Sequence, residues 1–289
     1  MACRLNNIFN LLVTLLLLFT ISSCKQAKVE YYSEVEKKSF FSRLLEDSIY
    51  YNVYRPHTKH PIDGYDLLYL LHGHGGNHDD WFEYEEGRVQ PILDSLIKNQ
   101  MIPPVVAVSL DAANSWYVNR HIPMESVYFD EFIPHIDSSL QDFLNKEKRV
   151  IAGNSAGGYG ALRFILKYPD HFSSGILLSP AAYEPVPPGI SSSRKIDVFA
   201  KDSIFNDSIW NSFSYTNIPI NAPEEIAHLL ISTGIDDEYE IITVIDSLKL
   251  HLDKNNIDYN VTLVPGGHEW NVWREIFALD VTRAFEIRK

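Results

Sequence analysis

The chain has 289 residues, a length that suits one large domain or two small ones. Hydrophobic residues make up 45% of it and charged residues 22%, a balance typical of a globular protein with a substantial core, so disorder and coiled coil are excluded for most of the length. Lys plus Arg number 25 against 38 for Asp plus Glu, which gives a formal net charge of -13. Because so acidic a surface repels phosphate backbones and no run of Lys or Arg offsets it, nucleic-acid binding is not expected.

The first 24 residues have the layout of an export signal. Arg4 supplies a positive start, residues 8–21 form an almost unbroken apolar run, and small residues precede Cys24. The run is too short and too poorly flanked for a stable membrane span. The ending I-S-S-C resembles a bacterial lipoprotein box, in which the signal is cut before the Cys and its thiol is lipidated; a plain secretory signal is the alternative. We expect a signal peptide over residues 1–23, then a lipidated Cys and a polar tether over residues 24–38.

This reading places the protein outside the cytoplasm. Acyl chains on Cys24 would hold it at a membrane without a spanning helix, as a lipoprotein of the periplasm or the cell surface. The chain has only one other cysteine, Cys3, which leaves with the signal. A disulfide and a catalytic cysteine are therefore both excluded. The oligomeric state is left open.

From Ser39 to Lys289 the sequence has no Gly/Ser linker, repeat or low-complexity block, which favours one domain. Strands are predicted at 39–45, 49–54, 67–71, 105–109, 149–152, 175–178, 227–233 and 259–263. Helices are predicted at 89–97, 129–144, 156–168, 239–252 and 272–287. This alternation indicates an α/β protein with a mostly parallel sheet covered by helices on both faces. Weak periodicity and several prolines over about 184–225 indicate an inserted lid or binding loop.

The segment around Ser155 is the most informative part of the chain. It reads G-N-S-A-G-G, after the predicted strand 149–152 and before the helix that begins near Ala156. A G-x-S-x-G between strand and helix makes a sharp turn, whose glycines let neighbouring backbone pass close while the Ser hydroxyl projects above the sheet edge. Ser155 is therefore the candidate nucleophile.

A serine hydroxyl needs a base to take its proton, and the base needs an orienting carboxylate. His268 is the candidate base because it follows the last predicted strand, in a loop that two glycines make roomy. The loop after the preceding strand offers three carboxylates, Asp236, Asp237 and Glu238, of which Asp237 is preferred as the acid. The others could cap the following helix.

Two backbone amides are expected to hold the oxyanion. Ala156 follows the nucleophile at a helix N-terminus, where an unpaired N–H favours negative charge. The strand 67–71 ends in H-G-H-G-G, whose glycines allow backbone N–H groups to point inward. We expect the amides of His74 and Ala156 to form the oxyanion hole.

These residues resemble the esterase D-like branch of the α/β-hydrolase superfamily, which includes feruloyl and acetyl xylan esterases, enterobactin esterases and mycolyltransferases. The resemblance rests on segments spread over nearly the whole mature chain: Y-N-V-Y-R-P from Tyr51, L-L-H-G from Leu70 through Trp81, G-N-S-A-G-G, G-I-D-D ending at Asp237, and G-H-E-W around His268. It implies the α/β-hydrolase fold over residues 39–289, the acid at the last position of a G-x-x-D element, and an oxyanion donor directly after His-Gly. The chain departs from many members at the two residues that flank the nucleophile.

The resemblance implies a secreted serine esterase that cleaves carbohydrate-linked acyl, feruloyl or acetyl esters of small molecules or glycans without a cofactor. Four aromatic residues in loops near predicted strand ends are candidates for binding sugar or phenolic rings, or for satellite core: Trp81, Trp116, Tyr117 and Trp270. An acyltransferase would use the same triad, and a non-catalytic glycan binder on this scaffold is a further alternative.

A zinc site is the competing reading of the segment that contains His72, His74, His78, Asp79 and Asp80, since imidazoles and carboxylates are the usual ligands. The metallo-hydrolase pattern H-x-H-x-D-H needs Asp and His where this chain has Gly and Asn. We therefore expect no metal here and a polar oxyanion loop instead.

Overall fold

The computed structural model describes residues 32–141 and 143–286. Its main strands are β1 (Ser33–Ser42), β2 (Asp47–Pro56), β3 (Tyr65–Leu71), β4 (Val105–Leu110), β5 (Leu144–Asn154), β6 (Ser174–Leu178), β9 (His228–Gly234) and β10 (Tyr259–Val264). The helices are α2 (Val89–Lys98), α3 (Met124–Ser126), α4 (Ile133–Ser139), α5 (Ala156–Lys167), α6 (Asp207–Ser212), α7 (Ile241–Lys254) and α8 (Trp270–Ala284). In these described residues, no helix is both long and apolar enough to cross a membrane.

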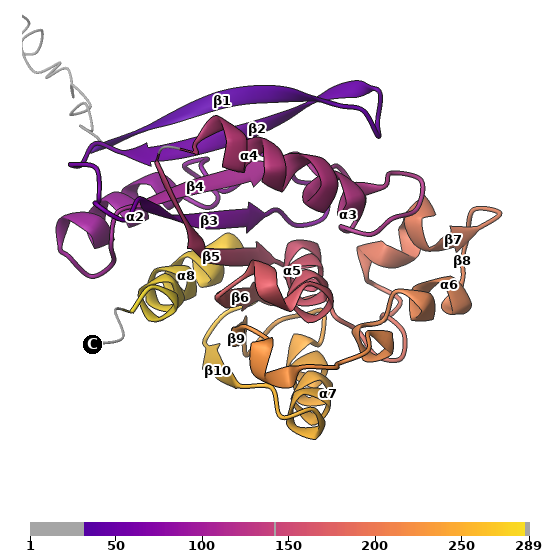
Figure 1. Cartoon of the computed structure of the whole chain (residues 1–289). Helices are drawn as coiled ribbons and strands as arrows, with labels where there is room; N and C mark the ends of the chain where they lie inside the picture. The colour runs from indigo at the N-terminus through magenta and orange to yellow at the C-terminus, as the bar shows by residue number, and fades with distance from the viewer. Residues whose placement is uncertain (1–31, 142, 287–289) are drawn as a thin grey trace, which may run out of the picture. The chain divides into compact units, whose positions relative to one another are not determined.

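The eight strands form one sheet in the order β1-β2-β4-β3-β5-β6-β9-β10 (Figure 1). The six strands from β4 to β10 pair in parallel, while β1 and β2 are antiparallel to each other and β2 is antiparallel to β4. The predicted mostly parallel sheet is confirmed. Its carboxyl ends gather the loops after β5, β9 and β10 at one edge, where ligands bind in sheets of this kind.

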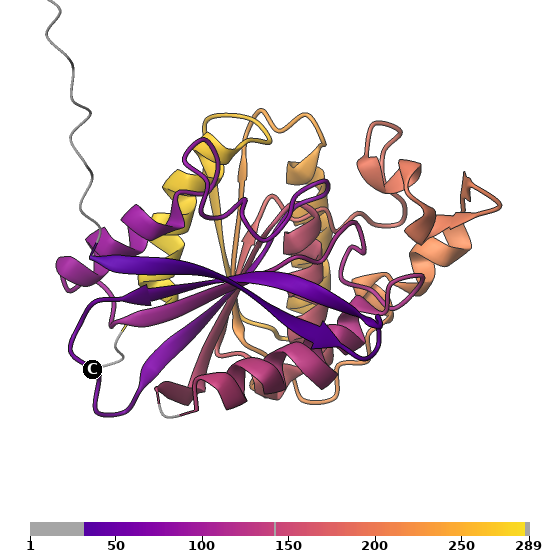
Figure 2. The same cartoon turned by 90° about the horizontal axis from the view of Figure 1, so that it is seen from above.

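Helices cover both faces of the sheet, as predicted. Helices α2 and α8 lie on one face, and α4, α5 and α7 lie on the other (Figure 2). Every residue of β3 is buried. Leu68 and Leu70 pack in the cluster under α2 and α8, whereas Leu67, Tyr69 and Leu71 pack in the opposite one. A strand with two buried faces reads as a continuous apolar run, which is why the sequence pattern located it.

The domain begins earlier than expected. β1 starts at Ser33, inside the range expected for the tether, and pairs along its whole length with β2. The first six residues of β1 were not predicted as a strand because they are mostly polar. Polar residues are tolerated there because an edge strand exposes part of its surface. Ser33 pairs with Pro56 at the amino ends of the parallel strands, since β2 runs antiparallel to β4. Residues 1–31, which include the expected signal and Cys24, lie outside the described residues.

The predicted helix 129–144 is wrong in its bounds. The segment consists of α3, a π-helical stretch at Val127–Phe132 and then α4, and β5 begins at Leu144. Pro134 lies at the start of α4 and has no N–H to donate into the preceding turn. The hydrogen-bond pattern therefore changes at this proline, which an apolar stripe cannot reveal.

Residues 184–225, here called the insertion, pack firmly against the domain. They contain the small hairpin β7 (Ala200–Lys201) and β8 (Ile204–Phe205), helix α6 and short 3-10 turns. Trp210 is 1% exposed and stacks on Tyr159 of α5, with ring centroids 5.6 Å apart. Phe199 meets Trp116 edge to face at 5.5 Å. The insertion is therefore anchored by aromatic packing.

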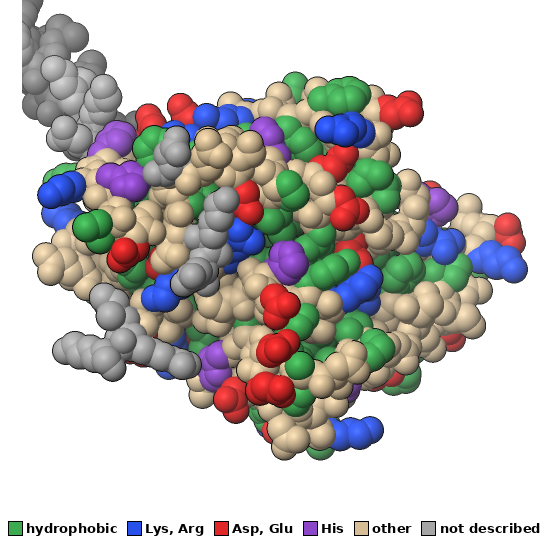
Figure 3. Space-filling model, viewed as in Figure 1, with side chains coloured by type: hydrophobic (Ala, Val, Ile, Leu, Met, Phe, Trp, Pro, Cys, Tyr) green, Lys and Arg blue, Asp and Glu red, His purple; other side chains and the backbone are tan. Residues whose placement is uncertain are grey.

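The surface agrees with the charge count. Basic side chains are scattered over the face of Figure 3 and do not gather into one basic surface. On this face, no cluster of Lys and Arg offsets the net charge of -13.

Candidate active site

Ser155 lies in the sharp turn between β5 and α5. Its backbone is left-handed, with φ 53° and ψ -114°, a conformation that costs free energy for any residue with a Cβ. The turn is tight enough that a Cβ on Gly153 would lie 2.2 Å from the Gly157 carbonyl oxygen, and one on Gly157 would lie 2.1 Å from the Leu71 carbonyl oxygen. Both positions therefore require glycine.

The end of β6 holds this strained turn in place. The Ser155 amide donates to the Leu178 carbonyl at 2.9 Å, and the Ala181 amide donates to the Ser155 carbonyl at 3.0 Å. The hydroxyl is thereby presented above the carboxyl edge of the sheet.

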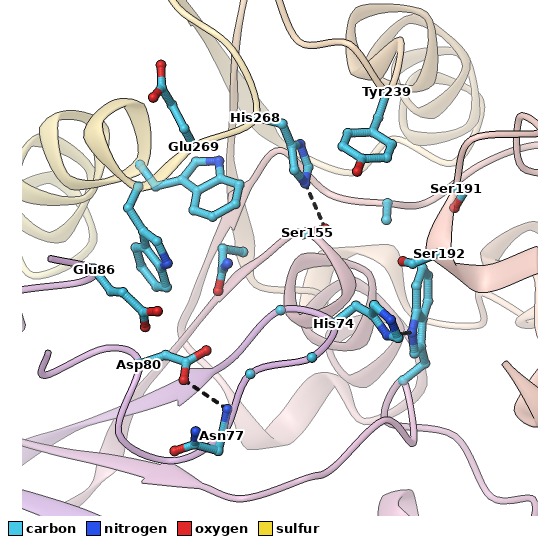
Figure 4. Close-up of a pocket in the computed structure, with 18 of the residues that line it drawn as sticks. His74, Asn77, Asp80, Glu86, Ser155, Ser191, Ser192, Tyr239, His268 and Glu269 are labelled. Carbon is cyan, nitrogen blue, oxygen red and sulfur yellow. Dashed lines mark hydrogen bonds between the residues drawn. The ribbon is translucent and has the colours of Figure 1, made fainter. Parts of the chain in front are cut away.

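Three side chains that are far apart in the sequence meet at this edge. His268 Nε2 lies 2.9 Å from Ser155 Oγ (Figure 4). On the other side of the ring, His268 Nδ1 lies 2.8 Å from Asp237 Oδ2. The loops after β5, β9 and β10 supply one residue each. Because an ionised carboxylate can only accept, Nδ1 carries the imidazole proton, and Nε2 is free to accept the Ser155 hydroxyl proton.

Asp237 stays ionised although its side chain is fully buried. Burial by itself would raise the pKa of this carboxyl, but hydrogen bonds from His268, the Tyr239 amide and the Thr233 hydroxyl outweigh it, and the pKa lies below its ordinary value. Its neighbours have other contacts: Asp236 is exposed, and Glu238 accepts the His268 backbone amide at 3.3 Å. Among the three candidate carboxylates, Asp237 alone meets the imidazole ring.

The loop 72–75 runs beside the nucleophile. A Cβ placed on Gly73 would lie 3.6 Å from Ser155 Cβ, so the next residue, His74, is close to the reacting centre. Ala156 is the first residue of α5, and its amide is one of those at a helix N-terminus that have no intrahelical acceptor. Both expected oxyanion donors therefore belong to segments that border Ser155.

Residues 112–117 hold this loop in shape. The Tyr117 hydroxyl donates to the His72 carbonyl at 2.8 Å, and Asn114 Oδ1 accepts the Gly75 amide at 2.8 Å. His72 Nδ1 donates to the Gly73 carbonyl at 2.8 Å while Nε2 accepts the Ala112 amide at 3.0 Å. Both His72 nitrogens are thus occupied in the neutral form, and burial lowers the pKa of this imidazole.

The four aromatic candidates divide into two pairs. Trp116 and Trp270 line the pocket over Ser155. Trp81 and Tyr117 are each 1% exposed and do not line it, so their expected contact with substrate does not fit the structure. Trp81 packs edge to face against Trp270 at 5.2 Å. The pattern of aromatics near strand ends could not separate a ring that faces a cavity from one buried behind it.

The pocket has a volume of about 580 Å³, which suits a small organic ligand or one or two sugar rings. Sequence reasoning missed several of its lining residues: Asp80, Glu86, Tyr183, Ser191, Ser192, Tyr239, Glu269 and Trp273. Three sequence features pointed to part of this set: the polar segment that contains Asp80, the G-H-E-W motif that contains Glu269, and the predicted binding loop that contains Ser191 and Ser192.

The two sides of the pocket differ in charge. Asp80, Glu86 and Glu269 lie on one side of Ser155, and Ser191 and Ser192 of the insertion lie on the other (Figure 4). Burial, together with the negative charges of Asp80 and Glu83, raises the pKa of Glu86. Among the described residues, no Lys or Arg lines this pocket. The cavity therefore repels anionic groups and offers acceptors to hydroxyl groups.

The arrangement of the side chains does not favour the zinc site considered for residues 72–80. Within residues 32–141 and 143–286, no three His, Cys, Asp or Glu side chains gather as metal ligands would. The two nitrogens of His72 instead form hydrogen bonds with the Gly73 carbonyl and the Ala112 amide.

Tyr117→Phe tests the support of the oxyanion loop. The change leaves the buried His72 carbonyl without its donor, so we expect a loss of about 1–3 kcal/mol in the free energy of unfolding and a fall in kcat of about 3- to 30-fold as the loop loosens. Urea unfolding and ester kinetics measure the two effects. Tyr69→Phe is the matched control, because Tyr69 is also buried and its hydroxyl has no partner in the described part of the chain. Equal effects in both variants would contradict the assignment.

The chain resembles known esterases in sequence and in fold. The family model named Esterase matches residues 42–284. An acetyl esterase of Caldicellulosiruptor saccharolyticus is 30% identical over 73% of this chain and 80% of its own length. An endo-1,4-beta-xylanase/feruloyl esterase of Xylanibacter ruminicola is 29% identical over 53% of this chain, which spans only 22% of the length of that protein.

Solved structures match the fold at lower identity. A ferulic acid esterase superimposes with a TM-score of 0.72 at 20% identity, over 89% of this chain and 99% of its own. An S-formylglutathione hydrolase from Agrobacterium tumefaciens gives a TM-score of 0.70 at 16% identity, over 89% of this chain and 96% of its own. These likenesses establish the predicted α/β-hydrolase fold. The chain thus belongs to the Esterase family and falls within the carboxylic ester hydrolases.

Proposed function

We propose that the protein is a serine esterase that removes acyl groups from uncharged, hydroxyl-rich carbohydrate esters. The hydrogen-bonded series Ser155–His268–Asp237, with spacings of 2.9 and 2.8 Å, is the observation that carries the proposal. Nucleophile, base and orienting acid are the three parts that acyl transfer through a serine requires.

In the first half of the reaction, Ser155 Oγ attacks the ester carbonyl carbon while His268 Nε2 takes the hydroxyl proton. Asp237 stabilises the imidazolium that forms, and the amides of His74 and Ala156 donate to the oxyanion. His268 then gives its proton to the alcohol oxygen as the carbon–oxygen bond breaks. The alcohol leaves, and the acyl group remains on Ser155.

In the second half, water attacks the acyl carbon while His268 again takes a proton. The tetrahedral intermediate collapses, the proton returns to Ser155 Oγ, and the carboxylic acid leaves. Every step uses groups of this chain and water alone.

The pocket supports the substrate class. Carboxylates accept hydrogen bonds from sugar hydroxyls, and indole rings such as those of Trp270 and Trp273 pack against sugar faces. A cavity bordered by Asp80, Glu86 and Glu269 disfavours negatively charged carriers such as glutathione. The names of the relatives point the same way: an acetyl esterase, a xylanase/feruloyl esterase and a ferulic acid esterase of Anaeromyces mucronatus solved with ferulic acid.

Replacement of single triad members tests the mechanism. Ser155→Ala removes the nucleophile and is expected to lower kcat toward p-nitrophenyl acetate by at least about 10⁴-fold, with an unchanged circular dichroism spectrum. Asp237→Asn is expected to lose about 10³- to 10⁴-fold because the imidazole loses its orienting charge. Asp236→Asn is the matched control and is expected to stay near wild type. Full turnover by Ser155→Ala, or a larger loss in Asp236→Asn than in Asp237→Asn, would contradict the proposal.

Glu86→Ala tests the substrate class. Loss of a charged acceptor is expected to raise KM for an acetylated xylo-oligosaccharide by about tenfold, while KM for p-nitrophenyl acetate stays the same because that ester carries no sugar hydroxyl. Glu85→Ala is the control, since Glu85 is exposed and lies outside the pocket lining. If KM rises equally for both esters, or rises in Glu85→Ala as well, Glu86 does not bind the sugar.

The protein is further proposed to be exported and held at a membrane by acyl chains on Cys24. The apolar run and the I-S-S-C ending support this proposal. Cys24→Ala is expected to move the protein from the membrane fraction to the soluble fraction of the producing cells, as measured by ultracentrifugation and immunoblotting. Unchanged partitioning of the variant would count against lipidation.

A further inference from the structure

We propose that Ser179 and Thr233 are positioning residues that hold the acid of the triad through a one-way chain of hydrogen bonds, which begins at the indole of Trp273. This inference rests on the proposed function, since it assigns a role to residues behind Asp237. It adds two side chains that neither the sequence pattern nor the pocket lining pointed to.

Four atoms from separate parts of the chain lie in series. Trp273 Nε1 donates to Ser179 Oγ at 3.0 Å, Ser179 Oγ lies 3.0 Å from Thr233 Oγ1, and Thr233 Oγ1 donates to Asp237 Oδ2 at 3.0 Å. The same carboxylate oxygen meets His268 Nδ1 at 2.8 Å. We call this series the Trp273–Asp237 chain.

The direction of every hydrogen bond in the Trp273–Asp237 chain is fixed by chemistry. The ionised carboxylate can only accept, so the Thr233 hydroxyl donates its one proton to Asp237. Ser179 must then donate to Thr233. The indole N–H can only donate, which supplies the hydrogen bond that Ser179 accepts. The three dipoles therefore all point toward the negative charge of Asp237.

Because the Trp273–Asp237 chain is buried, the loss of any one of its hydrogen bonds is costly in free energy. Ser179 and Thr233 are both completely buried, and Trp273 is 6% exposed. A buried hydroxyl that loses its partner cannot turn to water instead, so each member depends on the next. Ser179 also has a left-handed backbone, with φ 43°, held by its amide donating to the Ser232 carbonyl at 2.6 Å. Strain of this kind persists where the surrounding structure demands one particular side-chain direction.

The Trp273–Asp237 chain begins and ends beside the base. The indole of Trp273 meets the His268 ring edge to face, with centroids 4.9 Å apart and planes at 88°. Trp273 also lines the pocket. The His268 imidazole therefore contacts the Trp273 ring on one side and the Asp237 carboxylate at Nδ1. The hydroxyls of Ser179 and Thr233 connect these two neighbours by hydrogen bonds. Neither Ser179 nor Thr233 lines the pocket, so removal of either hydroxyl is expected to loosen the orientation of His268 without removing a group that lines the pocket.

Thr233→Val tests this directly, because valine keeps the shape and removes the hydroxyl. We expect kcat toward p-nitrophenyl acetate to fall by about 10- to 100-fold, the size of a lost hydrogen bond to a charged group, with KM within about twofold of wild type. Thr233→Ser restores the hydroxyl and is expected to recover at least about a third of kcat. Ser179→Ala is expected to lower kcat in the same way, and the double variant Ser179→Ala/Thr233→Val to lose little more than Thr233→Val alone.

Ser232→Ala is the matched control. Ser232 is the neighbour of Thr233 on β9, is equally buried, and its hydroxyl has no partner in the described part of the chain. Its kcat is expected to equal that of wild type. Wild-type kcat in Thr233→Val, no rescue by Thr233→Ser, or an equal loss in Ser232→Ala would overturn the proposal. If Thr233→Val does not fold, the losses in Ser179→Ala and the recovery in Thr233→Ser decide the question.

The positioning role of Thr233 and the serine mechanism can be contradicted separately. If Ser155→Ala is inactive and Thr233→Val is fully active, the triad stands and the positioning role falls. If Ser155→Ala keeps its activity, the serine mechanism itself falls, whatever Thr233→Val does.

Discussion

A buried carboxylate that remains charged is the constraint on which the site depends. Asp237 is out of contact with water, so its charge survives only through the donors that surround it: the His268 ring, the Tyr239 amide and the Thr233 hydroxyl. His268 lies in the loop after β10, Tyr239 lies in the loop between β9 and α7, and Thr233 lies on β9 itself. The strand order of the sheet is what brings them together, because the carboxyl ends of β5, β9 and β10 open at one edge.

Electrostatics also divides the pocket in two. The carboxylates of Glu86 and Glu269 border one side, while the other side is built by neutral groups of the insertion such as Ser191. A single ester has two unlike ends, an acyl group and an alcohol, and an asymmetric cavity can hold each against its own wall. The aromatic packing of Trp210 and Phe199 fixes the neutral wall in place.

Features with a local physical cause could be predicted from the sequence. Buried parallel strands such as β3 appear as unbroken apolar runs, and the turn at Ser155 needs glycines at fixed positions because backbone atoms crowd it. Features that depend on distant partners could not. Tyr117 and Trp81 have the same residue types as a sugar-binding wall, but the packing of other segments buries them. Ser179 and Thr233 carry no motif, since their role exists only once β6, β9 and α8 are assembled.

The antiparallel hairpin of β1 and β2 has a practical consequence. Through the pairing of Ser33 with Pro56, it brings the described chain into the domain at the amino ends of the parallel strands, a full strand length from the edge that carries Ser155. A bead, a fusion partner or any other support joined ahead of Ser33 would therefore occupy the end remote from catalysis. Attachment directly at Ser33 would leave the mouth of the cavity free for a bulky polymer to approach.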